Sequence, residues 1–198
     1  MPRPTEEREQ GAPSFSPLRP PGDHRPSPAG RRRRATSSEK LALLSGTGVL
    51  VLTMVHHVYG ALLYETPERY HAVYIAGAAL ALMVSADWLS RRRPSSVLGR
   101  VAWWTGWSVN GVVAVLLFGA IEGFYNHVLK VALYFGGLPE HHMGRLYSDA
   151  LFEMPNDVIF ELTGGLHVIP SVFAAVFLAQ TLVERGYHSC ERTSTSGG

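Results

Sequence analysis

The chain has 198 residues, of which 46% are hydrophobic and 17% are charged, and its formal net charge is +2. The charged fraction lies below the roughly 25% usual in soluble domains, which argues against an ordinary soluble globular protein. A single cysteine, Cys190, excludes a disulfide framework within the chain and any cysteine-rich zinc or iron–sulfur site.

The first segment, residues 1–38, contains eight of the thirteen prolines and few apolar residues. This composition predicts a disordered cytoplasmic tail. The tail includes Arg31–Arg34, which we interpret as a topology signal that touches anionic lipid headgroups. Nucleic-acid binding is not expected, because no folded reading element accompanies the charge. A basic block before an apolar run also resembles a secretory signal, but the run is long and no small-x-small cleavage site follows it, so we favour a retained first span.

Four apolar stretches are long enough to cross a bilayer as helices. They cover residues 41–64, 70–89, 101–123 (with a helical extension to about 135) and 158–183. The breaks at 65–69 and 90–96 are short, whereas the third, 136–157, is long, and loops of that length are often functional. The sequence predicts an all-α membrane protein, an antiparallel four-helix transmembrane bundle over residues 39–185. Residues 186–198 are expected to form a flexible cytoplasmic tail.

The basic residues predict which way the bundle sits, because cytoplasmic loops are enriched in Lys and Arg. Eleven of them flank one side of the predicted spans: Arg31, Arg32, Arg33, Arg34, Lys40, Arg91, Arg92, Arg93, Arg100, Arg185 and Arg192. Three flank the other: Arg69, Lys130 and Arg145. We therefore expect a multi-pass protein of the cell membrane with both termini in the cytoplasm.

Ionisable side chains gather at the predicted outer side of this bundle. Seven of the nine histidines fall there: His56, His57, His71, His127, His141, His142 and His167. Intramembrane ionisable groups are costly and indicate a functional site by default. The depth of each residue in the membrane can be estimated from the rise of 1.5 Å per helical residue. By this estimate, a smaller set on different helices lies at overlapping depths: His56, His57, Glu122, Asn126, His127, Glu161 and His167.

Helical spacing limits how these groups can meet. Glu122 and Asn126 are four residues apart and share one face of an α-helix. His127 is displaced from Glu122 by roughly 140°, so both reach one site only from a helix edge or a distorted turn. Gly119 and Gly123 would permit such a distortion. In the fourth span, Gly164-Gly165 and Pro170 predict a kink near His167.

Imidazoles and carboxylates are ligands for zinc, iron and copper, and helical bundles build such sites from facing side chains. The expected metal ligands are His57, Glu122, Asn126, His127, Glu161 and His167. The alternative cofactor is haem b, held axially by His56 or His57 opposite His127 or His167. No Glu-x-x-His repeat within a span supports a di-iron site, and no C-x-x-C-H motif supports haem. His141, His142 and Met143 in the outer loop together suit copper.

Three other interpretations stay open. The polar groups can simply pair with one another across helices. They can form the proton or cation relay of a small transporter, through Glu122, Glu161 and His167. The chain can also be a non-catalytic subunit that docks onto other membrane proteins or onto copies of itself. No Gly-x-Ser-x-Gly or His-Glu-x-x-His motif indicates a hydrolase, and the sequence names no reaction.

Overall fold

The computed structural model describes residues 35–147 and 154–195, with side chains described as far as residue 185. The tail expected to be disordered lies outside the described residues up to position 34. The chain divides into two units, 1–31 and 32–198, and the second contains every element discussed below. Its described residues are almost entirely helical and include no strand.

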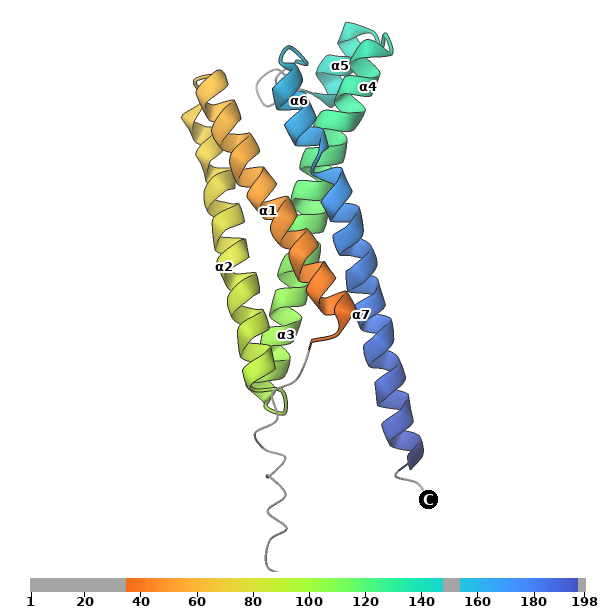
Figure 1. The fold of residues 1–198 in the computed structure, drawn as a ribbon. Helices are drawn as coiled ribbons and strands as arrows, with labels where there is room; N and C mark the ends of the chain where they lie inside the picture. The colour runs from red at the N-terminus through yellow and green to blue at the C-terminus, as the bar shows by residue number, and fades with distance from the viewer. Residues whose placement is uncertain (1–34, 148–153, 196–198) are drawn as a thin grey trace, which may run out of the picture. The chain divides into compact units, whose positions relative to one another are not determined.

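The helices follow one another with few breaks (Figure 1). A 3₁₀ turn, η2, precedes the second long helix, and η3 is a π-helical segment that continues α3 without interruption. The elements are α1 (Ser37–Leu63), η2 (Pro67–Arg69), α2 (Tyr70–Arg92), α3 (Val97–Val109), η3 (Asn110–Leu129), α4 (Lys130–Phe135), α5 (Glu140–Leu146), α6 (Val158–Gly165) and α7 (Val168–Thr195). The loop expected at 136–157 thus contains a short helix, and the backbone of α7 continues into the expected C-terminal tail.

Side-chain caps set where three of these helices begin. Thr36 accepts from the backbone N–H of Glu39 while the Glu39 carboxylate accepts from the N–H of Thr36, a reciprocal capping box. Ser96 caps α3 through Gly99 N at 3.0 Å. Asp157 caps α6 by accepting from Phe160 N at 2.7 Å, the role that its place before an apolar run predicts.

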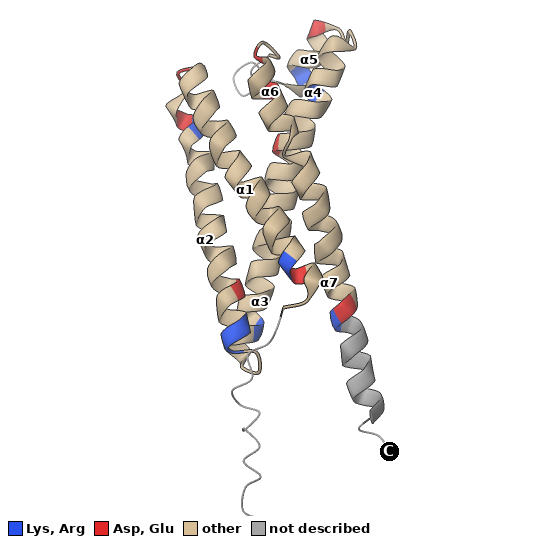
Figure 2. Cartoon of the chain, in the orientation of Figure 1, with Lys and Arg blue, Asp and Glu red and all other residues tan. Residues whose placement is uncertain are grey.

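Four helices in the described part of the chain are long and apolar enough to cross a membrane: Ser37–Leu63, Pro67–Arg92, Val97–Phe135 and Val158–Arg185. Charged residues gather towards the two ends of these helices, with mostly uncharged lengths between them (Figure 2). The prediction of an all-helical protein with four such segments is therefore confirmed.

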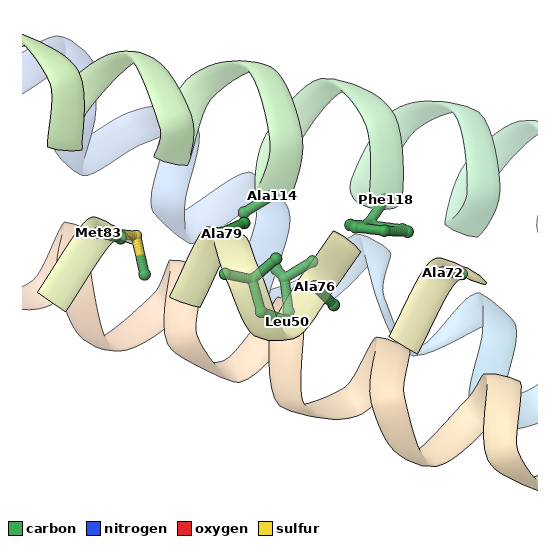
Figure 3. Close-up of a cluster of buried hydrophobic side chains, with 8 residues drawn as sticks. Leu50, Ala72, Ala76, Ala79, Met83, Ala114 and Phe118 are labelled. Atoms are coloured by element: carbon green, nitrogen blue, oxygen red, sulfur yellow. The ribbon is translucent and has the colours of Figure 1, made fainter. Parts of the chain in front are cut away.

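Small residues let the long helices pack closely. Ala72, Ala76 and Ala79 on α2 lie in one cluster with Leu50 of α1 and Phe118 of η3 (Figure 3). Every one of these side chains is at most 7% exposed. Alanine and glycine at such contacts allow backbones to approach and maximise van der Waals packing.

Two glycines of η3 permit its close contact with α7 and with His167, which precedes α7. A Cβ at Gly119 would collide with Ser171, and one at Gly123 would lie 2.7 Å from the Cβ of His167. At the end of η3, the N–H of Lys130 bonds to the carbonyl of Tyr125, five residues earlier. Residues five apart are therefore brought one above the other, which an α-helix does not do.

Two tyrosines connect the short helix α5 to η3 through hydrogen bonds. The Tyr147 hydroxyl donates to the Tyr125 carbonyl at 3.0 Å, and the Tyr125 hydroxyl donates to the Leu146 carbonyl at 3.0 Å. Burial raises the pKa of Tyr147 to about 12. This hydroxyl therefore stays protonated and keeps its donor role throughout the neutral range.

Candidate metal centre

Side chains from three elements meet near the ends of α1 and η3 that lie next to α6. His56 and His57 come from α1, and Glu122 and His127 come from η3. Glu161 comes from α6. The imidazoles of His56 and His127 are 0% and 2% exposed, so this is an interior cluster rather than a surface patch.

The Glu122 carboxylate lies at the centre of the cluster. Its Oε1 atom is 3.7 Å from Nε2 of His56, and 3.5 Å from Nε2 of both His57 and His127. Its Oε2 atom accepts a hydrogen bond from Asn126 Nδ2 at 2.7 Å. Three imidazole nitrogens therefore surround one carboxylate oxygen, while Asn126 orients the carboxylate through the other.

These spacings fit the coordination shell of a small ion. The ligand atoms of His56, Glu122 and His127 all lie within 4.8 Å of one another. A tetrahedral ion with bonds of about 2.0–2.1 Å holds its ligand atoms about 3.3 Å apart. The three Nε2–Oε1 distances are a few tenths of an ångström longer than this. The imidazole nitrogens of His56 and His127, which lie within 4.8 Å of each other, would also have to approach to this spacing around an ion. His57 contacts the same carboxylate oxygen and is a fourth potential ligand.

The hydrogen bonds of His56 determine which of its ring nitrogens carries the proton and which one directs a lone pair at Glu122. Its Nδ1 lies 3.0 Å from the Thr163 hydroxyl oxygen. That hydroxyl donates to the carbonyl of Ile159 at 2.8 Å, so it accepts from Nδ1–H. A neutral imidazole carries one N–H, and Nε2 is then an acceptor aimed into the cluster. Within the described structure Nε2 makes no hydrogen bond.

His127 is oriented in the same sense by a carboxylate. Its Nδ1–H donates to Glu161 Oε2 at 2.7 Å, and the Lys130 ammonium lies 3.0 Å from Glu161 Oε1. Metal-binding histidines usually donate their second N–H to a carboxylate or carbonyl in this way, which fixes the tautomer and raises the basicity of the ligand. In its neutral form, His127 thus directs its Nε2 lone pair at the same carboxylate oxygen as His56 does.

Local backbone features explain how these rings reach the centre. The π-helical winding of η3 brings Glu122 and His127, five residues apart, onto one face. A Cβ at Gly164 of α6 would collide with the imidazole of His127, so only glycine permits this approach. Phe160, from the same helix, stacks on His56 with ring centroids 4.4 Å apart.

His167 has a different place from the other histidines. It lies at the break between α6 and α7, which is the interruption that Gly164-Gly165 and Pro170 predict. Its Nδ1–H donates to the Gly164 carbonyl at 2.7 Å, and its Nε2 lies 3.1 Å from the Thr53 hydroxyl. Both ring nitrogens therefore have partners. His167 braces the helix break against α1, with its ring 5.5 Å from that of His56.

The packing of the rings favours an ion over haem. The His56 ring contacts those of His57 and His127 edge to face, with centroids 5.2 and 4.7 Å apart. Axial ligation of haem would require a porphyrin between two such rings, and rings in contact leave no space for one.

The other histidines of the predicted outer side, His71, His141 and His142, do not join the cluster. His141 and His142 are exposed, with ring centroids 3.9 Å apart, while Met143 is 3% exposed. These three side chains thus do not present a common copper-binding face. His71 contacts the carbonyl of Glu68 in its own turn.

Sequence reasoning missed two groups that shape the centre, Thr163 and Lys130. Thr163 is four residues before His167, a spacing that places both polar side chains on one face of a helix. The spacing does not predict that Thr163 contacts His56. Lys130 is three residues after His127 on a continuous helix, a spacing that places both side chains on one face. Its 2% exposure, which hydropathy does not reveal, makes it part of the site.

Comparison of the chain with protein-family models, with curated proteins and with solved structures found no match in any of the three.

Proposed function

We propose that this chain is a multi-pass membrane protein, an antiparallel four-helix transmembrane bundle, that binds one transition-metal ion between His56, Glu122 and His127. His57 is the additional ligand. The observation that carries the proposal is the pair of Nδ1–H groups donated to Thr163 and Glu161, because they direct two Nε2 lone pairs at one carboxylate oxygen. Without an ion, the buried Nε2 atom of His56 faces the Glu122 carboxylate and has no hydrogen-bond partner among the described residues.

The membrane setting is supported by the four long apolar helices and by the many large apolar side chains on their surface. Val55, Leu62, Tyr74 and Leu116, for example, are between 54% and 75% exposed. In water such a surface would be an aggregation liability, whereas in a bilayer it faces acyl chains. The excess of arginine near the start of α1 and between α2 and α3 orients the metal centre towards the extracytoplasmic side.

The donor set restricts the ion to a few elements. Two or three imidazoles with one carboxylate suit Zn²⁺, Fe²⁺ and Cu²⁺, while the lack of sulfur in the cluster disfavours Cu⁺. Zinc would make the centre structural or a Lewis acid, and iron or copper would make it redox-active. Asn126, Glu161 and His167 contribute by orienting ligands and the backbone around them.

Titration of chelator-treated protein with Co²⁺ tests this proposal, because a tetrahedral Co²⁺ site gives strong visible bands. We expect one equivalent to bind with such bands, and Zn²⁺ to abolish them by displacement. Glu122→Gln should weaken binding strongly, whereas Asp87→Asn, which alters an ion pair with Arg91 elsewhere, should not. If wild type shows no saturable binding, or if both variants behave alike, the proposed centre is wrong.

A further inference from the structure

A cavity of about 750 Å³ lies beside the cluster and is lined by residues of η3, α4 and α6. Its size is within the roughly 300–1,000 Å³ typical of small-molecule sites. His127 and Glu161 line it on the side of the cluster, and Val128, Leu162 and Leu166 are among its other walls. The proposed ligand His127 and its hydrogen-bond partner Glu161 therefore also form one wall of this cavity.

The walls of this cavity are unequal in polarity. Most of the lining is aliphatic or aromatic, and Val128, Leu162 and Leu166 are 41%, 59% and 39% exposed. The described cavity thus opens through an apolar surface that, in the proposed bundle, faces acyl chains. A molecule that enters by this route must be lipid-soluble.

The polar end of the cavity selects the head of such a molecule. Glu161 is a carboxylate with an 11% exposed side chain; Oε2 accepts from His127, and the Lys130 ammonium lies 3.0 Å from Oε1. A carboxylate without a proton offers only acceptors, so it favours a head that donates a hydrogen bond. A fatty-acid carboxylate has no such donor, whereas alcohols and phenols have one.

We propose that this cavity binds a lipid-soluble molecule with a hydroxyl or phenol head, with its head at Glu161 beside His127 and its apolar body along Val128 and Leu162. The inference rests on the proposed function in taking the helices to lie in a bilayer and His127 to be a metal ligand. Occupation of the cavity itself needs no ion. The hydroxyl-headed molecule is then the substrate or effector class of the metal centre, delivered sideways from the lipid.

The experiment measures saturable binding of 4-decylphenol to the full chain in phospholipid nanodiscs, with decylbenzene and decanoate as matched probes. We expect decylbenzene, which lacks the hydroxyl, and decanoate, which is anionic, to bind at least tenfold more weakly. Ala132→Phe places a ring in the cavity and should lower phenol affinity at least tenfold. Ala81→Phe, at an exposed position of α2 that does not line the cavity, should leave it unchanged.

Two measurements keep this test separate from that of the metal centre. Phenol binding is measured in both chelated and Co²⁺-loaded protein, and Co²⁺ binding by Ala132→Phe shows that the variant folds. If the chelated protein binds the phenol but the protein does not bind Co²⁺, the proposed metal centre is wrong and the proposed cavity occupant stands. Equal binding of phenol and decylbenzene would mean a groove for phospholipid acyl chains and would overturn the inference. Equal affinities in Ala132→Phe and Ala81→Phe would overturn it as well.

Discussion

At the scale of single residues, Glu122 is the group around which the centre is organised. Its two oxygens are used differently, one towards three imidazoles and the other towards Asn126. A carboxylate held in this way cannot swing away from its neighbours without breaking a partly buried hydrogen bond. The amide of Asn126, which the sequence predicts to be a ligand, donates a hydrogen bond to Glu122 Oε2 and thereby orients that carboxylate.

The Glu161 carboxylate should tune the centre without binding the ion. Glu161→Gln keeps the shape of the side chain but removes the charge that polarises His127. We expect metal affinity to fall about 10–100-fold, the usual effect of losing a hydrogen-bond partner of a ligand. Competition with a chromophoric chelator measures this change.

The same substitution also removes the negative charge beside the buried Lys130 ammonium, which costs stability. The double variant Glu161→Gln, Lys130→Met separates the two effects. It should regain thermal stability while its metal affinity remains low. Recovery of affinity along with stability would show that Glu161 acts on the fold alone.

At the scale of elements, the centre depends on two departures from the regular α-helix. The π-helical winding of η3 aligns Glu122 with His127, and the break between α6 and α7 turns the Gly164 carbonyl towards His167. π-Helical turns are uncommon and frequently lie at functional sites. Each departure is adjacent to glycines that permit close contact with a neighbouring helix.

The glycine pair of α6 provides a matched test of this packing. Gly164→Ala would drive a methyl group into the His127 ring, whereas Gly165→Ala would meet Val128 at an ordinary 3.5 Å. We expect Gly164→Ala to lose metal affinity and about 1–3 kcal/mol of stability, as for other overpacked sites. Gly165→Ala should resemble wild type in thermal unfolding and in chelator competition. Equal effects of the two changes would contradict this account of how His127 is positioned.

The sequence predicts the elements better than the contacts between them. Hydropathy identifies the four long helices because runs of about 20 apolar residues have no other common use. It does not predict η3, since α-helical spacing separates Glu122 from His127 and the i→i+5 pairing has no hydropathy signal. The sequence likewise does not predict which of the histidines face the proposed ion. The hydrogen bonds that occupy both nitrogens of His167 form only when α1 and α6 pack together.

At the scale of the whole molecule, the arrangement of charge implies an orientation in the membrane. If both termini lie in the cytoplasm, as the basic residues predict, Cys190 lies inside and the α4–α5 turn lies outside. Cys190, the single native cysteine, should escape a membrane-impermeant maleimide in intact cells and react after permeabilisation. A Cys190→Ser chain carrying Glu140→Cys, at an exposed position, should react in intact cells. The opposite labelling pattern would invert the bundle and move the centre to the cytoplasmic side.

An ion bound only to the folded bundle should also stabilise it as a whole. At a free ion concentration one hundred times the dissociation constant, the expected gain is about 2.7 kcal/mol. Because ligands come from α1 and η3 and are braced by α6, the gain should appear as one cooperative shift in thermal unfolding. Unfolding that does not respond to the ion in wild type, or that shifts equally in Glu122→Gln, would contradict this coupling.

The most direct test of the central claim is the metal content of the detergent-purified full chain, measured by inductively coupled plasma mass spectrometry after removal of loosely bound ions. The account predicts close to one zinc, iron or copper per chain in wild type and in Asp87→Asn. It predicts a large loss in His56→Ala and Glu122→Gln. Wild-type protein that carries no stoichiometric metal, and takes up none when supplied with each ion, would contradict it.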